Sequence, residues 1–133
     1  MARVFLIEDD PVIREMLADA LRDAGHTVAT AANGWEALKD FRPAEHELVI
    51  TDVLMPHVDG VDILRILRRE TPRIPVVAIS GSFGRGDGEL LQAMMNLGAT
   101  GVLRKPFSPQ QLVATVAAAL AQGGGPLDSP GVE

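Results

Sequence analysis

The stretch VFLIEDDPVIREML, residues 4–17, combines the signals of a strand and of a helix. Residues 4–7 form a short apolar run, which is typical of a strand covered on both faces. Asp10 is followed by Pro11, a pair that favours a helix start, with the aspartate as N-cap and the proline in the first turn. From Ile13 onward, apolar residues return every four positions, as on the buried side of a helix. The stretch therefore predicts a strand that turns directly into a helix.

The same strand-then-helix pattern recurs along the chain. Further strands are expected at residues 27–30, 48–51, 75–79 and 101–103, and each is followed by a segment with helical spacing of its apolar residues. Strict alternation of this kind predicts a parallel sheet with helices on both faces, joined by right-handed crossovers. The expected fold is thus a doubly wound α/β domain with a five-stranded parallel sheet. In such sheets, ligand sites lie at the carboxyl ends of the strands, where the strand order reverses.

The composition limits the class of protein. A chain of 133 residues suits one domain, and we expect residues 1–122 to form it, followed by a flexible Gly/Pro-rich tail at residues 123–133. The formal net charge of −6 argues against nucleic acid or an anionic membrane as the main partner. The chain has no cysteine, which excludes disulfides, thiolate metal sites and thiol catalysis. No apolar run approaches the ~18 residues of a membrane span, so we expect a soluble cytoplasmic protein.

Polar side chains collect where the expected strands end. They are Glu8, Asp9 and Asp10 after the first strand, Asp52 after the third, Ser80 after the fourth, and Arg104 and Lys105 after the fifth. Because the carboxyl ends of parallel strands meet at one edge of the sheet, we expect these groups to converge. Carboxylates that lie close together repel one another, and they stay ionised only when a cation compensates them. Oxygen ligands without histidine or cysteine favour Mg²⁺.

This combination of groups also permits phosphoryl chemistry. A carboxylate can attack phosphorus and form an aspartyl phosphate. The transferred group then needs positive charge and hydrogen-bond donors around its oxygens, which Mg²⁺, Lys105 and the Ser80 hydroxyl could supply. Taken singly, each residue has a plainer interpretation: Asp10 as a helix cap, Asp52 as an ordinary loop acid and Ser80 as part of a turn. The functional interpretation rests on their joint placement at four strand ends.

Four motifs, FLIEDDPVIRE, LVITDVLMPHVDG, VVAISG and GVLRKPF, contain these strand ends and follow one another along the chain. With them, the sequence resembles the receiver domain of bacterial two-component response regulators, of the chemotaxis-regulator type, over roughly residues 2–121. The resemblance implies the flavodoxin-like sheet order 2-1-3-4-5. It also implies that the protein takes a phosphoryl group from the phosphohistidine of a histidine kinase or of a histidine phosphotransfer protein.

The resemblance assigns the metal site and the phosphoacceptor by position. Asp52 matches the phosphoacceptor aspartate. Asp9 matches the residue that binds Mg²⁺ directly, and Glu8 matches its neighbour, which acts through a water molecule. Leu54 matches the residue whose backbone carbonyl binds the metal, so its side-chain type matters little. Mg²⁺ is accordingly the expected cofactor.

The resemblance also assigns the residues that sense the phosphoryl group. Ser80 matches the hydroxyl residue and Lys105 the lysine that pairs with the phosphoaspartate, and the bond between Lys105 and Pro106 is expected to be cis. The sequence departs from the family at Val102, where an aromatic switch residue is common. A second departure is the glycine-rich loop at residues 81–88, which is longer than usual. Our hypothesis is that this loop becomes ordered only on phosphorylation.

The expected protein is a stand-alone response regulator that catalyses only its own phosphorylation and dephosphorylation. Its signal would leave through contact of the fourth helix, the fifth strand and the fifth helix with a downstream protein, and not through nucleic acid or a membrane. One alternative is a receiver-like module that binds partners without phosphorylation. A second alternative is a Mg²⁺-dependent phosphohydrolase of the haloacid dehalogenase type, but such an enzyme needs a second acid at the position of Leu54. A third is a flavodoxin-like mononucleotide-binding protein, but this needs a phosphate cradle where the chain has acids at 8–10. A transcription factor would need a recognition helix or a basic stretch after residue 121.

Overall fold

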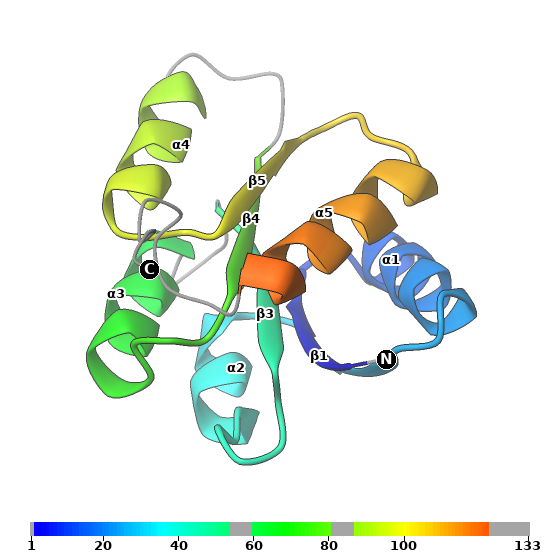
Figure 1. The fold of residues 1–133 in the computed structure, drawn as a ribbon, viewed down its shortest axis with the longest axis horizontal. Helices are drawn as coiled ribbons and strands as arrows, with labels where there is room; N and C mark the ends of the chain where they lie inside the picture. Colours follow the sequence, from blue (N-terminus) through cyan, green and yellow to red (C-terminus); the bar gives the residue numbers. More distant parts are fainter. Residues whose placement is uncertain (1, 54–59, 81–86, 123–133) are drawn as a thin grey trace.

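The computed structural model describes residues 2–53, 60–80 and 87–122, in which five strands alternate with five helices (Figure 1). In chain order the elements are β1 (Arg3–Ile7), α1 (Pro11–Asp23), β2 (Thr27–Ala31), α2 (Gly34–Asp40), β3 (Leu48–Asp52), α3 (Gly60–Glu70), β4 (Val76–Ser80), α4 (Asp87–Asn96), β5 (Gly101–Arg104) and α5 (Pro109–Gln122). The strands form one parallel sheet in the order β2-β1-β3-β4-β5. This confirms the predicted doubly wound fold and its flavodoxin-like order. Among the described helices, none is long and apolar enough to cross a membrane.

The helices cover both faces of the sheet, and two hydrophobic clusters fill the space beneath them. Figure 1 shows α1 and α5 on one side of the sheet and α2, α3 and α4 on the other. Along β1, Val4 and Leu6 belong to the cluster with α1 and α5, whereas Phe5 and Ile7 belong to the cluster with α2, α3 and α4. All four side chains are at most 2% exposed. This is why the strand is apolar throughout and does not alternate with polar residues.

Local sequence signals set the starts of the helices. The side chain of Asp10 accepts hydrogen bonds from the backbone N–H groups of Val12 and Ile13, at 2.9 and 3.2 Å, and so caps α1. A reciprocal pair caps α5: the Gln111 N–H donates to Oγ of Ser108 at 3.0 Å, and the Ser108 N–H donates to Oε1 of Gln111 at 2.7 Å. The cap on α1 fixes the direction in which the chain leaves β1, next to the acidic residues.

The three strands that carry Asp52, Ser80 and Val102 end one residue later than the sequence predicts, and for the first two this changes the setting of a site residue. β3 continues through Asp52 and β4 through Ser80. The reason is that both residues still pair in the sheet, Asp52 with Ile79 and Ser80 with Arg104. Asp52 and Ser80 are therefore the last residues of strands and not the first residues of loops. Their backbone is held by the sheet.

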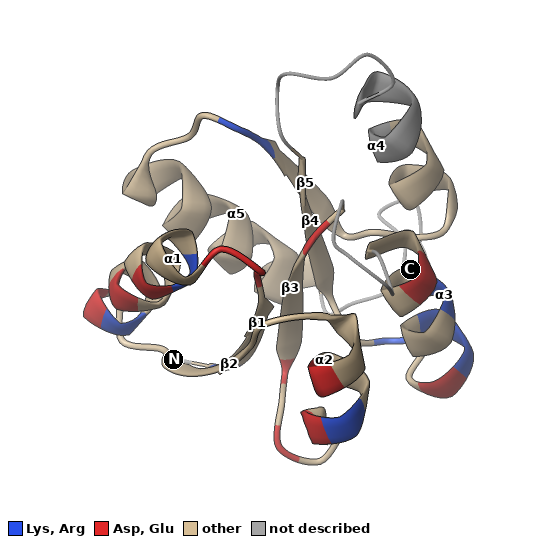
Figure 2. Cartoon of the chain, turned by 180° about the vertical axis from the view of Figure 1, so that it is seen from behind, with Lys and Arg blue, Asp and Glu red and all other residues tan. Residues whose placement is uncertain are grey.

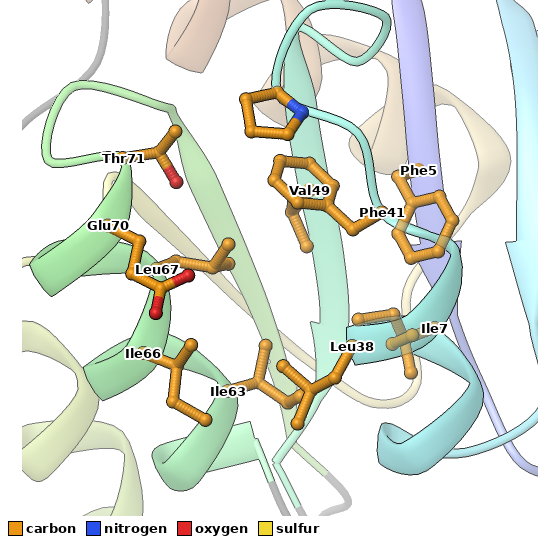
Figure 3. Close-up of a pocket in the computed structure, with 12 residues that line it drawn as sticks. Phe5, Ile7, Leu38, Phe41, Val49, Ile63, Ile66, Leu67, Glu70 and Thr71 are labelled. Carbon is orange, nitrogen blue, oxygen red and sulfur yellow. The ribbon is translucent and has the colours of Figure 1, made fainter.

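A cavity of about 100 Å³ lies between α2 and α3 on one face of the sheet (Figure 3). The sheet contributes Phe5 and Val49 to its lining, α2 contributes Ala37, and α3 contributes Ile63. Helix α2 has seven residues and α3 has eleven, so α2 covers less of this face. Leu38 and Glu70, which also line it, are exposed, so the cavity is partly open to solvent, and one larger side chain could fill part of it.

Candidate functional site

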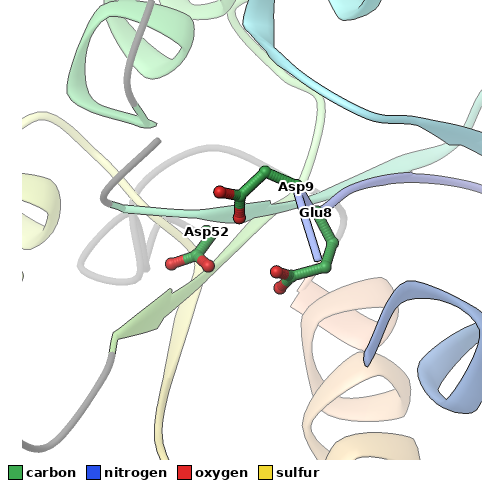
Figure 4. Close-up of side chains that lie close together, drawn as sticks. All are labelled: Glu8, Asp9 and Asp52. Atoms are coloured by element: carbon green, nitrogen blue, oxygen red, sulfur yellow. The ribbon is translucent and has the colours of Figure 1, made fainter. Parts of the chain in front are cut away.

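Three acidic side chains lie close together at two neighbouring strand ends (Figure 4). Glu8 and Asp9 follow β1, and Asp52 ends β3, which is next to β1 in the sheet. Each side chain offers one carboxylate oxygen within 4.8 Å of the others. Glu8 and Asp52 are only 1% and 6% exposed, whereas Asp9 is exposed, so solvent reaches the group from the side of Asp9. Asp10, the fourth acid at this edge, caps α1, as the Asp10-Pro11 pair predicts.

Lys105 brings a positive charge to this group. Its Nζ lies 3.5 Å from Oδ2 of Asp52 and 3.8 Å from Oε1 of Glu8. Its backbone N–H donates to the carbonyl of Ser80 at 2.8 Å, which holds the chain after β5 against the end of β4. The bond between Lys105 and Pro106 is cis. Figure 2 shows the acidic segments after β1 and at the end of β3 at the same edge of the sheet as the basic segment that follows β5.

Glu8 is held by one carboxylate oxygen, and its other oxygen has no hydrogen-bond donor among the described residues. Oε2 accepts a hydrogen bond from the backbone N–H of Asp10 at 3.1 Å. Oε1 is buried and accepts none, although the Lys105 ammonium lies 3.8 Å away. A buried polar atom without a partner costs about 1–3 kcal/mol, and more when it is charged. Such an oxygen favours either a proton on the carboxyl group or a cation beside it.

Burial and mutual repulsion disfavour the ionised forms of two of these carboxyl groups. Desolvation, together with the nearby charge of Asp52, raises the pKa of Glu8 from its ordinary value of 4.5 to about 7. Desolvation also raises the pKa of Asp52, although the Lys105 ammonium opposes this effect. Three carboxylates thus share one ammonium group. A further cation would be needed for all three to be ionised together.

The donor set of this group fits a magnesium ion. The candidate ligands are carboxylate oxygens, which is the chemistry that Mg²⁺ prefers. The unsatisfied Oε1 of Glu8 marks a place where a cation would relieve a buried charge. Asp9, the exposed member, leaves the group open to water and to phosphate oxygens, both of which Mg²⁺ usually keeps as ligands. Leu54, the predicted backbone ligand, lies outside the described residues.

The remaining predicted residues differ in burial, and some of them lie outside the part of the chain that the structure describes. Ser80 is buried, at 2% exposed, and ends the strand next to the one that carries Asp52. Val102 lies on β5 and is 36% exposed, so an aliphatic side chain stands at the position of the expected switch residue. Residues 81–86 of the glycine-rich loop and the predicted tail at 123–133 lie outside the described residues, so the hypotheses about them stay predictions.

Gly60, the first residue of α3, has a role that the sequence analysis missed. A side chain there would place its Cβ 2.5 Å from the carbonyl oxygen of Asp52 and 2.8 Å from the Cα of Val53. The Gly60 N–H also donates to the Val53 carbonyl at 2.9 Å. Glycine thus allows α3 to begin directly against the backbone of Asp52. In the sequence, the Asp-Gly pair at 59–60 indicates only an ordinary helix start, because no local signal shows that the chain returns to this point.

Comparison with known proteins identifies the family. Residues 4–117 match the family described as the response regulator receiver domain. The chain belongs to this family. A receiver domain protein from Clostridium thermocellum aligns with a TM-score of 0.83 at 32% identity, over 92% of this chain and 96% of that one. The chemotaxis protein CheY4 of Vibrio cholerae aligns with a TM-score of 0.78 at 33% identity, and the alignment covers 90% of the present chain and 98% of the CheY4 chain.

The receiver domain also matches part of longer curated proteins. The alkaline phosphatase synthesis transcriptional regulatory protein SphR of Synechococcus elongatus is 34% identical, over 98% of this chain and 54% of its own length. The DNA-binding response regulator MtrA of Mycolicibacterium smegmatis is 34% identical, over 89% of this chain and 50% of its own length. The chain thus spans about half the length of these relatives. Their names give no support to the expectation that nucleic acid is not a partner, and that expectation stays a prediction.

Proposed function

We propose that this receiver domain is a phosphorylation switch in which Asp52 accepts a phosphoryl group from the phosphohistidine of a histidine kinase or a histidine phosphotransfer protein. The observation that carries the proposal is the Asp52 carboxylate, buried at the end of β3, with the Lys105 ammonium 3.5 Å from Oδ2 and two further carboxylates beside it. A buried aspartate with this surrounding is suited to nucleophilic attack on phosphorus.

The reaction requires an ionised carboxylate at Asp52. One of its oxygens attacks the phosphorus, the N–P bond to the donor imidazole breaks, and the imidazole nitrogen keeps the electron pair and then takes a proton from solvent. Burial raises the pKa of Asp52, and the Lys105 ammonium counteracts this, so Lys105 helps to keep the nucleophile charged. After transfer, the same ammonium faces an acyl phosphate that carries about −1.5 to −2 charge.

Magnesium would be held by Asp9 and Asp52 directly, by Glu8 through a water molecule, and by the backbone carbonyl of Leu54. When bound, it would neutralise charge on the transferring phosphoryl group. The buried Oε1 of Glu8 supports this proposal, because it has no hydrogen-bond donor among the described residues and is therefore available to the metal-bound water molecule. The Asp9 carboxylate lies on the solvent side, where a donor protein can approach.

The phosphorylated state would be sensed by Ser80 and Lys105. Ser80 ends β4, and Lys105 follows β5, so a change at either one bears on the β4–β5 edge of the sheet. We expect a shift in the population of conformations of the surface formed by α4, β5 and α5, which would contact a downstream protein. Val102, in place of an aromatic residue, means that this switch would act without a ring rotation.

The test is phosphotransfer from a panel of autophosphorylated histidine kinases to the purified chain. Asp52→Asn should abolish labelling, whereas Asp40→Asn, a change of an exposed aspartate at the end of α2, should leave it unchanged. The label should be released by hydroxylamine, as an acyl phosphate is. Labelling that persists in Asp52→Asn would refute the assignment of the acceptor. No labelling by any donor would favour the binding module that works without phosphorylation, and turnover of small phosphate esters would favour the phosphohydrolase.

A further inference from the structure

Arg14, in the first turn of α1, contacts the acidic site through the backbone. Its Nη1 donates a hydrogen bond of 2.9 Å to the backbone carbonyl of Glu8. Its own N–H closes the first turn of the helix on the carbonyl of Asp10, at 2.8 Å. The side chain is neither fully buried nor fully exposed. Arg14 therefore ties α1 to the residue that directly follows β1.

The carbonyl of Glu8 depends on this donor. Glu8 is 1% exposed, so water cannot readily replace a lost hydrogen bond. The other polar groups of this residue are fixed from different directions. Its N–H donates to the carbonyl of Ala31 at the end of β2, at 3.1 Å, and its Oε2 accepts from the N–H of Asp10. The hydrogen bond from Arg14, on α1, fixes the remaining polar group of Glu8, its backbone carbonyl.

We propose that Arg14 is a positioning residue for the magnesium site, which orients the Glu8 and Asp9 carboxylates by holding the peptide group between them. The carbonyl that Arg14 binds belongs to the peptide bond that joins these two residues, so a rotation of that peptide would turn both side chains. The inference rests on the proposed metal-dependent phosphorylation of Asp52. It does not rest on the charge of Arg14, because the charges that chiefly act on Glu8 are those of Asp52 and Lys105.

The variants Arg14→Met, Arg14→Lys and Arg22→Met test this role. Methionine keeps a long side chain without a donor, and lysine keeps a charged donor on a flexible stem. Arg22 lies on the same helix, is exposed, and pairs with two exposed acids on α1, so its replacement is a matched control. The first readout is the dissociation constant for magnesium chloride, measured by calorimetry. The second is the backbone amide exchange of residues 8–13 in the metal-free protein.

Arg14→Met should weaken magnesium binding about 10-fold, as is typical when a group that orients metal ligands is lost. The amide of Asp10, which donates to the Glu8 carboxylate, should exchange faster in this variant. Arg14→Lys should restore most of the affinity, and Arg22→Met should match the wild type. If Arg14→Met does not fold, Arg14→Leu, which also lacks a donor, replaces it in both measurements.

An unchanged magnesium affinity and unchanged exchange in Arg14→Met would overturn the proposal, and so would an equal loss in Arg22→Met. Phosphorylation by phosphoramidate separates positioning from direct contact with the phosphodonor. At saturating Mg²⁺ the Arg14→Met rate should return to the wild-type value, and a rate that stays low would overturn the positioning role. A wild-type protein that binds Mg²⁺ but is never labelled at Asp52 refutes the proposed function alone, since affinity and exchange still decide the role of Arg14. A wild-type protein that binds no Mg²⁺ overturns both.

Discussion

Removing the charge of Glu8 should stabilise the metal-free protein, and the gain should grow with pH. Glu8→Gln keeps the shape of the side chain and removes its ionisation. Burial and the charge of Asp52 raise the pKa of Glu8 from 4.5 to about 7, so in this interval the folded protein holds a proton that the unfolded chain releases. Because the unfolded state binds fewer protons, the stability of the wild type falls as the pH rises from the lower value to the higher.

The size of the effect follows from the two pKa values. The interval from 4.5 to about 7 corresponds to about 3 kcal/mol, at about 1.4 kcal/mol for each pH unit. Glu8 itself is buried, but solvent reaches the acidic group from the side of Asp9, so screening reduces the effect and this figure is an upper bound. The wild type and Glu8→Gln should therefore be about equally stable below pH 4.5, and the variant should be more stable by up to about 3 kcal/mol at about pH 8.

Urea unfolding of both proteins, with a chelator present and over a series of pH values, measures this difference. Taking the difference at each pH removes the contribution of other groups, such as His46, whose pKa is lowered by burial and whose protonation destabilises the fold as the pH falls. Glu70→Gln, an exposed change on α3, is the control and should shift stability by less than about 0.5 kcal/mol. Excess magnesium chloride should stabilise the wild type at high pH more than it stabilises Glu8→Gln.

A difference that does not change with pH would refute this reasoning, and so would a wild type that is the more stable protein at about pH 8. Either result would mean that Glu8 is ionised in the folded state without cost. The acidic group would then be balanced by Lys105 alone, and the unsatisfied oxygen of Glu8 would not indicate a cation site.

Two further changes test how the site and the core are packed. Gly60→Ala should lower stability by about 1–3 kcal/mol and slow the labelling of Asp52, because its Cβ would lie 2.5 Å from the Asp52 carbonyl oxygen. Urea unfolding and the phosphotransfer assay check the two effects, and a normal result in both would contradict the close approach. Ala37→Leu should raise the free energy of unfolding by about 1 kcal/mol, since its larger apolar side chain would be partly buried in the partly open cavity of about 100 Å³. Ala18→Leu, in the packed core beneath α1, should lower it by about 1–3 kcal/mol, and an equal loss in both variants would show that the cavity cannot be filled.

The fold could be predicted because its signals are local and repeat along the chain. The apolar run at 4–7, the Asp10 cap and the helical spacing after it each belong to a short segment, and the alternation of such segments restricts the sheet to a parallel arrangement. The positions of the strand ends were predicted less accurately, because pairing in the sheet decides where a strand ends and local composition does not. Asp52 and Ser80 look like loop residues in the sequence, yet the neighbouring strands hold them in the sheet.

The site was predictable as far as its residues act through their own side chains. The carboxylates of Glu8, Asp9 and Asp52 could be placed together from strand order alone. Gly60 and Arg14 could not, because each acts on a backbone carbonyl of a residue that lies elsewhere in the chain. Nothing in the type of a residue shows which carbonyl it will meet, so positions of this kind need the three-dimensional fold.

The surroundings of Asp52 combine a fixed backbone with an adjustable balance of charge. Its backbone pairs with Ile79 in the sheet, and Gly60 closes against its carbonyl from α3, so the main chain cannot shift without breaking the pairing or causing a clash. The charges around its carboxylate are less constrained, because the Lys105 ammonium lies between two acids, 3.5 Å from Asp52 and 3.8 Å from Glu8. When the charge on Asp52 changes, side chains nearby can therefore move in response, whereas the main chain of β3 cannot. Among the described groups, Lys105 is the one placed to respond first, and its backbone link to the end of β4 would carry that response into the sheet edge.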